Sequence, residues 1–229
     1  MAANNKIPVK YWLHNNMVTI NGQKMGKSLG NAVSLNQFFS GDHQLLDQAY
    51  SPATIRFFML QAHYRSPLDF SNEALQAAEK GLKKLWESYH SIEKLLPAEK
   101  STSDIKKLQE SCYEAMNDDL NTPILISHLF EGVRIINSVK DKKESITGDD
   151  LELLKNIMHT FVVDVLGLID EQTADKGNRM EILMNLVLEI RQNARKNKDW
   201  PTSDLIRDEL AKAGIRVKDT KEGSEWGFE

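Results

Sequence analysis

The chain has 229 residues, of which 29 are Lys or Arg and 33 are Asp or Glu, so its formal net charge is −4. With 41% hydrophobic and 27% charged residues, the composition is that of a protein that buries a core, and it excludes wholesale disorder. The single cysteine, Cys112, excludes an intrachain disulfide and a cysteine-rich zinc site, and it fits a reducing, cytoplasmic location. The most apolar stretch, residues 161–169, is too short to span a bilayer.

The first segment predicts β-strands. Residues 10–14 alternate weakly, and Met17–Ile20 is a run rich in β-branched side chains. Asn21-Gly22 follows, which is the strongest two-residue hairpin signal because both central residues of such a turn need positive φ. A basic loop with two glycines comes next, at residues 23–31. We therefore expect a rigid hairpin that carries a mobile tip.

From Ser34 onward the hydrophobic period becomes helical. Ser34 and Gln37 have the spacing of a capping box. Ser51-Pro52 predicts the start of a second helix, which Pro67 would stop. One face of this second helix is expected to carry Ile55, Phe58, Met59 and Ala62.

The middle of the chain predicts a bundle of helices. Residues 72–95 have apolar positions every three or four residues, and a proline follows at once. Three further stripes of the same period occupy residues 105–112, 126–136 and 151–165. Residues 141–150 are polar and predict a loop. Packed together, these helices form an antiparallel bundle.

A second polar break at residues 171–178 predicts a linker to a small terminal unit. In that unit residues 180–195 and 200–214 have helical patterns. Residues 215–219 alternate like a strand, with a possible partner at 226–228. The predicted fold class is therefore mainly α, with a short β-hairpin near the start and a small α+β unit at the end.

Positive charge is concentrated in this terminal unit. Residues 191–221 hold nine Lys or Arg and five Asp or Glu, a net charge of +4, although the whole chain is −4. A local positive charge of this kind favours contact with nucleic acid.

The residues most informative about chemistry form the Lys24–Ser28 loop, with the sequence Lys-Met-Gly-Lys-Ser. Two lysines three positions apart can both reach a polyphosphate, and their compact ammonium groups can neutralise charge that builds on a departing pyrophosphate. The flexibility of Gly26 would let the loop close over ATP. For two such lysines taken alone, a solvated lysine-rich turn is the simpler interpretation.

The Lys24–Ser28 loop resembles the KMSKS signature of the class I aminoacyl-tRNA synthetases, with Gly26 where that family has its central serine. Other stretches resemble the cysteinyl-tRNA synthetase family in particular, and they follow the order of that family. These stretches are Tyr11–Asn15, Lys27–Asn31, Ala62–Leu68, Met116–Pro123, Ala194–Trp200, Arg207–Leu210 and Gly214–Asp219.

The resemblance implies four parts in the chain. Residues 1–71 would be a remnant of the catalytic domain with the KMSKS-type loop and stem-contact helices. Residues 72–170 would be a helical bundle of the DALR type, 171–178 a linker and 179–229 an anticodon-binding domain. The family's nucleotide-binding half, with its His-x-Gly-His motif, cannot be found, so the chain resembles a C-terminal portion that would be inactive alone.

The resemblance also implies an activity and its residues. The family activates cysteine with ATP to cysteinyl-adenylate and transfers the cysteinyl group to tRNA(Cys). Lys24, Lys27 and Ser28 would serve catalysis, and the ATP contact would include Met25 and Gly26. The anticodon contacts would come from five positions, namely Arg195, Trp200, Asp204, Arg207 and Asp219. The family's zinc ion, held by two cysteines, a histidine and a glutamate, would lack its ligands here, so no metal ligand is assigned.

Several of these residues have an ordinary structural interpretation that the sequence leaves open. Trp200 could stack on an anticodon base or fill the core of the terminal unit. Asp204 could simply favour the N-terminal dipole of its helix, and Arg207 could belong to a solvated helix face. The segment His63–Arg65 is expected to be a joint between the catalytic remnant and the bundle, and the aromatic residues near the start are expected to pack.

Three further functions remain possible beside the enzyme portion. The chain could be a non-catalytic tRNA-binding module, a ligase that joins cysteine to a small amine, or a generic helical scaffold. The basic terminal unit argues against the small-amine ligase, and the Lys24–Ser28 loop is unexplained by a scaffold. We expect a cytoplasmic monomer whose least protected amides lie in residues 10–30.

Overall fold

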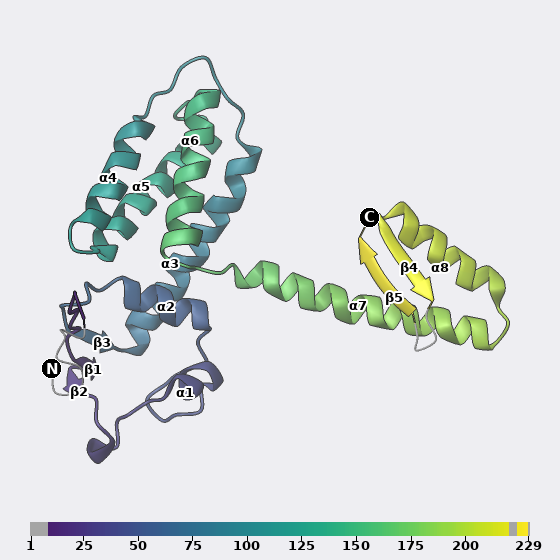
Figure 1. Cartoon of the computed structure of the whole chain (residues 1–229), viewed down its shortest axis with the longest axis horizontal. Coiled ribbons are helices and arrows are strands. Elements are labelled where there is room, and N and C mark those ends of the chain that lie inside the picture. The colour runs from purple at the N-terminus through teal and green to yellow at the C-terminus, as the bar shows by residue number, and fades with distance from the viewer. Residues whose placement is uncertain (1–8, 220–223, 229) are drawn as a thin grey trace. The chain divides into compact units, whose positions relative to one another are not determined.

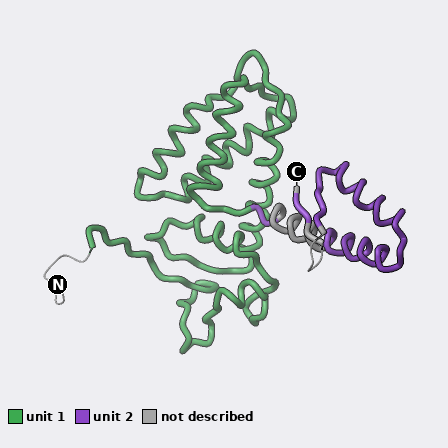
Figure 2. Tube along the Cα trace, turned by 45° about the vertical axis from the view of Figure 1, so that its right-hand side comes forward, with its two compact units in different colours: residues 1–169 green, residues 170–229 purple. Residues whose placement is uncertain are grey.

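The computed structural model describes residues 9–219 and 224–228, without the side chains of 172–182, 219, 224–225 and 228. The chain divides into two compact units, Met1–Ile169 and Asp170–Glu229 (Figure 2). Helices dominate both units and the strands form only small sheets, so the predicted mainly-α fold class is confirmed (Figure 1).

A three-stranded sheet opens the first unit. Strands β1 (Val18–Ile20) and β2 (Gln23–Lys24) form the predicted hairpin, in which Ile20 faces Gln23 across the turn. Both turn residues have positive φ, 50° at Asn21 and 76° at Gly22, as a two-residue hairpin requires. Strand β3 (Leu68–Phe70) lies parallel to β1 on its other side, which gives the strand order β2-β1-β3.

Two features of this sheet differ from the prediction. Residues 10–14 form no strand, and the chain there is held instead through Asn16, whose backbone N–H donates to the Tyr64 carbonyl at 3.0 Å. Strand β3 was not predicted, because three residues are too few to show the alternation of a strand. Its presence means that β1 has a partner within the chain on both edges.

Aromatic packing fixes this sheet to two helices. Helix α1 (Leu35–Ser40) begins with the predicted capping box between Ser34 and Gln37, and α2 (Pro52–Leu60) begins with the predicted cap at Ser51. The ring centroid of Phe70 lies 4.8 Å from that of Phe38 in α1 and 4.8 Å from that of Phe58 in α2. All three rings are buried, so the sheet is held by a well-packed aromatic cluster.

Helix α2 ends earlier than predicted. It stops at Leu60, and the Gln61 N–H bonds the Phe58 carbonyl three residues back, which tightens the last turn. Met59, predicted to face inward, is 49% exposed, and Ala62 lies beyond the helix. The early end releases the segment His63–Ser66 as a loop that leads into β3.

The predicted bundle is confirmed in α3 (Asn72–Ser91), α4 (Ile105–Asn117), α5 (Thr122–Lys140) and α6 (Gly148–Met158), and Figure 1 shows these helices side by side. A short 3₁₀ turn at Ile92–Lys94 extends α3. The described core of the bundle contains most of the predicted apolar positions, among them Leu75, Leu82, Leu85, Ile105, Leu108, Cys112, Leu129, Val133, Ile136, Leu151 and Leu154.

The end of the bundle changes its helical period. A π-helical segment, His159–Val165, follows α6 and rotates the later residues relative to an α-helix. Val165, predicted as part of the buried stripe, is therefore 41% exposed, whereas Leu166 and Leu168 are buried. Gly167 then ends the helix with a φ of +59°.

The polar loop predicted at residues 141–150 is shorter than expected. Thr147 caps α6 by accepting from the Asp150 N–H, and Asp149 and Asp150 occupy the first helical turn. Acidic residues favour this position because the helix N-terminus carries partial positive charge.

The second unit contains α7 (Glu171–Lys196), α8 (Trp200–Lys212) and the antiparallel strands β4 (Ile215–Asp219) and β5 (Ser224–Phe228). The α+β character predicted for it is confirmed. Residues 171–178, predicted as a linker, are helical instead of irregular. Their Glu, Gln, Ala and Lys residues have high helix propensity, which outweighs the single glycine. Within the described residues, every helix is either too short or too polar to cross a bilayer.

Candidate functional site

The Lys24–Ser28 loop lies directly after the β1–β2 hairpin. Lys24 pairs with Thr19 in the sheet, and the Met25 N–H donates to the Val18 carbonyl at 3.1 Å. Met25 is partly buried against the core of the unit, so its side chain holds the loop to the protein. Lys27 begins a single 3₁₀ turn, Lys27–Leu29, which ends at Gly30 with a φ of 68°. The two lysines therefore belong to a short, shaped loop and not to an extended helix.

Asn31 ties the two ends of this loop together. Its side-chain carbonyl oxygen accepts from the Gly26 N–H at 2.9 Å, and its side-chain amide donates to the Lys24 carbonyl at 3.1 Å. One side chain thus restrains the backbone on both sides of Met25. Sequence reasoning gave Asn31 no role, although it closes the Lys27–Asn31 string on which the resemblance partly depends.

Both lysine ammonium groups are available to a ligand. Lys24, Lys27 and Ser28 are all exposed. In the described part of the chain neither lysine forms an ion pair with a carboxylate, so each ammonium keeps three donors for an anion. Two adjacent uncompensated charges on one loop favour a polyvalent anion such as a polyphosphate.

A second anchor of the hairpin is Asp69 in β3. One of its carboxylate oxygens accepts from the Thr19 hydroxyl at 2.6 Å and from the Gly22 N–H at 2.8 Å. Asp69 therefore bridges the parallel partner strand and the turn. No sequence signal indicated this contact, because β3 itself was not predicted.

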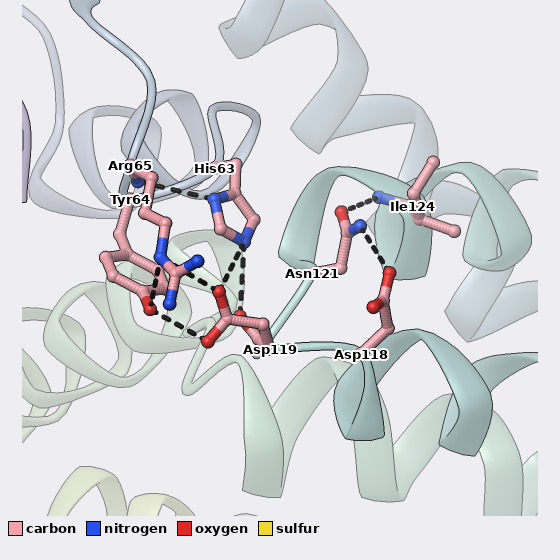
Figure 3. Close-up of polar contacts among 7 residues, drawn as sticks. All are labelled: His63, Tyr64, Arg65, Asp118, Asp119, Asn121 and Ile124. Atoms are coloured by element: carbon pink, nitrogen blue, oxygen red, sulfur yellow. Dashed lines mark hydrogen bonds and ion pairs between the residues drawn. The ribbon is translucent and has the colours of Figure 1, made fainter. Parts of the chain in front are cut away.

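Asp119 joins the N-terminal part of the first unit to the bundle (Figure 3). The Tyr64 hydroxyl donates to one of its carboxylate oxygens at 2.8 Å, and Arg65 Nε lies 3.1 Å from the other. His63 Nε2 lies 3.1 Å from the Asp119 carbonyl oxygen. Three successive residues of the loop after α2 therefore converge on one residue of the loop between α4 and α5.

The backbone conformation around Asp119 accompanies the contacts of its carboxylate with Tyr64 and Arg65. Asp119 and Leu120 both have left-handed φ values, 56° and 57°, a conformation that aspartate tolerates better than most residues. Asn121 then caps α5 by accepting from the Ile124 N–H, and its amide donates to Asp118 (Figure 3). Two of the strings that carried the resemblance, Ala62–Leu68 and Met116–Pro123, thus meet in space. This contact fits the joint expected for His63–Arg65.

In the second unit, the end of α7 and the start of α8 present two predicted RNA-binding residues, Arg195 and Trp200, to solvent. Trp200 is 56% exposed, so it does not fill the core of this unit, and the core interpretation is wrong. Asp199 caps α8 by accepting from the Thr202 N–H at 3.2 Å, which fixes the helix start beside Trp200. Arg195 is exposed in the last turn of α7.

Arg207 and Asp204 form an ion pair with each other. Arg207 Nη1 lies 3.1 Å from Asp204 Oδ1, and Arg207 Nη2 lies 3.2 Å from Asp208 Oδ1. Both predicted base-reading side chains are exposed, so their pairing has the form of the solvated helix face that the sequence left open. A bound nucleotide would have to displace these ion pairs to contact either side chain. The backbone of Asp219 pairs with Ser224, but its side chain lies outside the described residues.

Metal binding has no support among the described residues. They contain no group of three or more His, Cys, Asp or Glu side chains that could hold an ion. Cys112 is fully buried in α4, and burial raises the pKa of its thiol to about 12, so it stays protonated and is a poor ligand. These residues do not fit the zinc ion that the resemblance implies for the complete enzyme.

Three family models match successive parts of the chain. The catalytic domain of class I tRNA synthetases (C) matches residues 1–80, and the DALR domain matches residues 111–170. The cysteinyl-tRNA ligase anticodon-binding domain matches residues 184–226. The first match covers the hairpin with the Lys24–Ser28 loop, the second most of the bundle and the third most of the second unit. Together they define an architecture of the class I aminoacyl-tRNA synthetases.

Curated relatives agree with the family models. The chain is 60% identical over 221 residues to the cysteine–tRNA ligase of Parabacteroides distasonis, covering 95% of the chain and 45% of that protein. It is 59% identical over 220 residues to that of Bacteroides fragilis, with the same coverage. It is 44% identical over 239 residues to that of Cytophaga hutchinsonii, covering the whole chain and 47% of that protein. The chain belongs to the cysteine–tRNA ligase family, and it spans about half the length of these relatives.

Proposed function

We propose that this chain supplies the KMSKS-type loop and the tRNA-binding surface of a cysteine–tRNA ligase. The observation that carries the proposal is the Lys24–Ser28 loop, in which two exposed ammonium groups lie on a backbone restrained by Asn31. The family membership supplies the reaction, and the loop supplies a chemically suitable part of it. The substrates of the complete enzyme would be cysteine, ATP and tRNA(Cys), and the complete enzyme would act as a monomer in the cytoplasm.

The loop would act in adenylate formation. In this step a carboxylate oxygen of cysteine attacks the α-phosphorus of ATP, the bond to the bridging oxygen breaks, and pyrophosphate leaves with its electron pair. Lys24 and Lys27 would neutralise the negative charge that grows on the departing group, and Ser28 would add a hydrogen bond. Met25 and Gly26 would shape the backbone around the phosphates.

The second unit would hold the other end of the substrate. Trp200 would stack on an unpaired anticodon base, and Arg195 would contact phosphate or a base edge. Asp204, Arg207 and Asp219 would complete the recognition of base edges, with the ion pair between Asp204 and Arg207 opening on binding. The exposure of Trp200 and Arg195 supports this assignment.

Binding of tRNA by this chain tests the RNA part of the proposal. We expect the chain to bind tRNA(Cys) more tightly than the same tRNA with a substituted anticodon, and to bind both more weakly at 200 mM than at 50 mM salt. A filter-binding titration measures all four affinities. Equal affinity for the two tRNAs would remove the anticodon contact, and affinity independent of salt would remove the phosphate contacts.

Kinetics of a chimeric enzyme test the catalytic part. Residues 23–31 of this chain would replace the loop of an active cysteine–tRNA ligase, with and without Lys27→Ala. We expect the substitution to slow ATP–pyrophosphate exchange by about 10²–10³-fold while ATP affinity changes little, because the lysine acts on charge that develops in the transition state. Equal losses in rate and affinity would show that the lysine only binds ground-state ATP.

A non-catalytic tRNA-binding module is the second candidate, and the exposed Trp200 in a unit with local positive charge favours it. The two candidates make the same prediction for tRNA binding and differ in the chimera. A chimera with no exchange activity, even with Lys27 intact, would favour the module. A ligase for a small amine would gain nothing from the matched anticodon-binding domain.

A further inference from the structure

A lysine-lined groove lies on the bundle and shares no residue with either site described above. It runs between α3 and α5 with a volume of about 410 Å³. Its lining consists of Lys80, Lys83, Lys84, Glu87, Ser88, Asn137 and Lys140. Neither the resemblance nor the family matches assign these residues a function, and residues 80–88 and 137–140 are not among the strings that identify the family.

The four lysines of this groove carry charge that the protein does not neutralise. Lys80, Lys83 and Lys84 share one face of α3 because residues three and four apart are neighbours on a helix. Within the described residues none of the four lysines forms an ion pair with a carboxylate. Lys155 on the same bundle differs, since its ammonium lies 2.9 Å from Glu152 and 3.3 Å from Glu93. Glu87 is the one carboxylate in the lining, which leaves the groove with a net charge of +3 (four lysines minus one glutamate).

The floor of the groove is polar and hydrogen-bonded. Ser88 is buried, and the Asn137 side-chain amide donates to its hydroxyl oxygen at 3.3 Å. This contact ties α3 to α5 beneath the lysines, so the backbone positions of the four lysines are fixed relative to one another. Among the described residues that line the groove, none has an aromatic side chain on which a base could stack.

We propose that this groove binds the sugar–phosphate backbone of RNA, as a contact separate from the anticodon. The proposal rests on the proposed tRNA-binding function, which makes a polyanionic RNA the expected partner. Lysine ammonium groups are compact charges without the planar fork that selects a base edge, and a lining without aromatic residues argues against base stacking. The groove therefore adds affinity independent of sequence and positions the RNA on the bundle. An acidic protein surface is the alternative partner, and the experiment separates the two.

The test compares two double variants with equal loss of charge. Lys83→Gln with Lys84→Gln removes two charges from the groove, and glutamine keeps the helix propensity of lysine. Lys106→Gln with Lys107→Gln is the matched control, because these residues are an adjacent, exposed pair on α4 outside the groove. The affinity of the complete chain for tRNA(Cys) and for the anticodon-substituted tRNA is measured between 50 and 200 mM salt, together with the thermal midpoint of unfolding.

The groove variant should bind both tRNAs more weakly by the same factor. The slope of log affinity against log salt should become shallower by about 0.9 for each phosphate that the variant no longer binds. That slope corresponds to about threefold in affinity per phosphate over this range of salt. The preference for the cognate anticodon and the thermal midpoint should remain, and the control should match the wild-type slope.

The other outcomes identify what has failed. Equal slopes for the groove variant, the control and the wild type would overturn the groove proposal while leaving the proposed tRNA function intact. A wild-type chain that binds neither tRNA would overturn both proposals. Binding of poly-glutamate that the groove substitutions weaken, with tRNA binding unchanged, would assign the groove to an acidic protein partner and overturn the RNA assignment.

Discussion

Gly26 in the Lys24–Ser28 loop is not required by the conformation that the loop adopts here. Its φ of −165° and ψ of 140° describe extended backbone that any residue can adopt, and a Cβ added there would meet only ordinary contacts, the nearest at 3.8 Å from Leu29. Gly22 in the hairpin turn differs, since its φ is +76°. Serine, which the family has at position 26, would therefore fit this loop.

Replacing these two glycines should have opposite effects on stability. Gly26→Ala should leave the free energy of unfolding unchanged or raise it by up to about 1 kcal/mol, because it reduces the entropy of the unfolded chain. Gly22→Ala should lower it by about 1–2 kcal/mol, because alanine is strained at positive φ. Urea denaturation measures both. A large loss for Gly26→Ala would show that the loop needs glycine for another reason.

Cys112 makes the free energy of unfolding depend on pH in the alkaline range. Burial raises the pKa of its thiol from 9.0 to about 12, so the folded protein holds the neutral form. This preference stabilises the fold below pH 9 and is lost as the pH rises toward 12, because the unfolded thiol ionises first. Between pH 8 and pH 10 the wild type should therefore lose about 1 kcal/mol more unfolding free energy than Cys112→Ala.

Urea titrations of both proteins at the two pH values provide the comparison. Other groups that titrate in this range affect both proteins equally, so the difference isolates the thiol. An identical loss in the two proteins would mean that Cys112 ionises in the folded state as readily as in the unfolded state.

At the scale of elements, the turn after the π-helical segment is held by Arg56. Its Nε donates to the Leu166 carbonyl at 2.7 Å, and its guanidinium covers the position where Gly167 would carry a Cβ, with Nη2 2.7 Å away. Arg56 lies in α2, so this contact joins α2 to the end of the bundle.

A side chain at position 167 should therefore be costly. Gly167→Ala combines a φ of +59° with the displacement of Arg56, and it should lower the unfolding free energy by at least about 1–2 kcal/mol. Gly148→Ala is the control, since it lies in the first turn of α6 with open space around it and should stabilise by up to about 1 kcal/mol. Urea denaturation of both variants checks this, and equal effects would show that neither φ nor Arg56 restricts residue 167.

The sequence predicts most of these elements where local chemistry decides the outcome. Capping residues mark the starts of α1 and α2, Asn21-Gly22 fixes the hairpin, and apolar spacing locates the bundle helices. Prediction from the sequence fails where contacts with residues distant in the chain decide the structure. Strand β3 exists only because it pairs with β1, and the π-helical segment changes the period within an otherwise helical stripe.

In the candidate site, too, local sequence predicts some features and distant contacts determine others. The resemblance of the Lys24–Ser28 string predicts the role proposed for Lys24 and Lys27, whereas the exposure of Trp200 follows only from the fold. The restraint by Asn31, the anchor at Asp69 and the convergence on Asp119 depend on contacts that no local pattern encodes. Sequence therefore indicates the residues proposed to meet the substrate and misses those that hold them in place.

At the scale of the whole molecule, the proposed function divides between the two units. The first unit carries the Lys24–Ser28 loop and the bundle, and the second unit carries the exposed residues of α7 and α8. Each unit has its own buried core residues, so a surface substitution in one should leave the other folded. This division allows the proposed RNA contact of the second unit to be tested on the chain as it is.

The most direct measurement is the affinity of tRNA(Cys) for the Trp200→Ala variant. Stacking of a base on the indole is worth about 1–3 kcal/mol, so the variant should bind about 5–150-fold more weakly than the wild type, and Trp200→Phe should keep most of the affinity. Leu205→Ala is the matched control, because Leu205 is 61% exposed on α8 but faces a different side of the helix. We predict wild-type affinity for that control. Equal affinities for Trp200→Ala and Leu205→Ala would contradict the assignment of this surface to the anticodon.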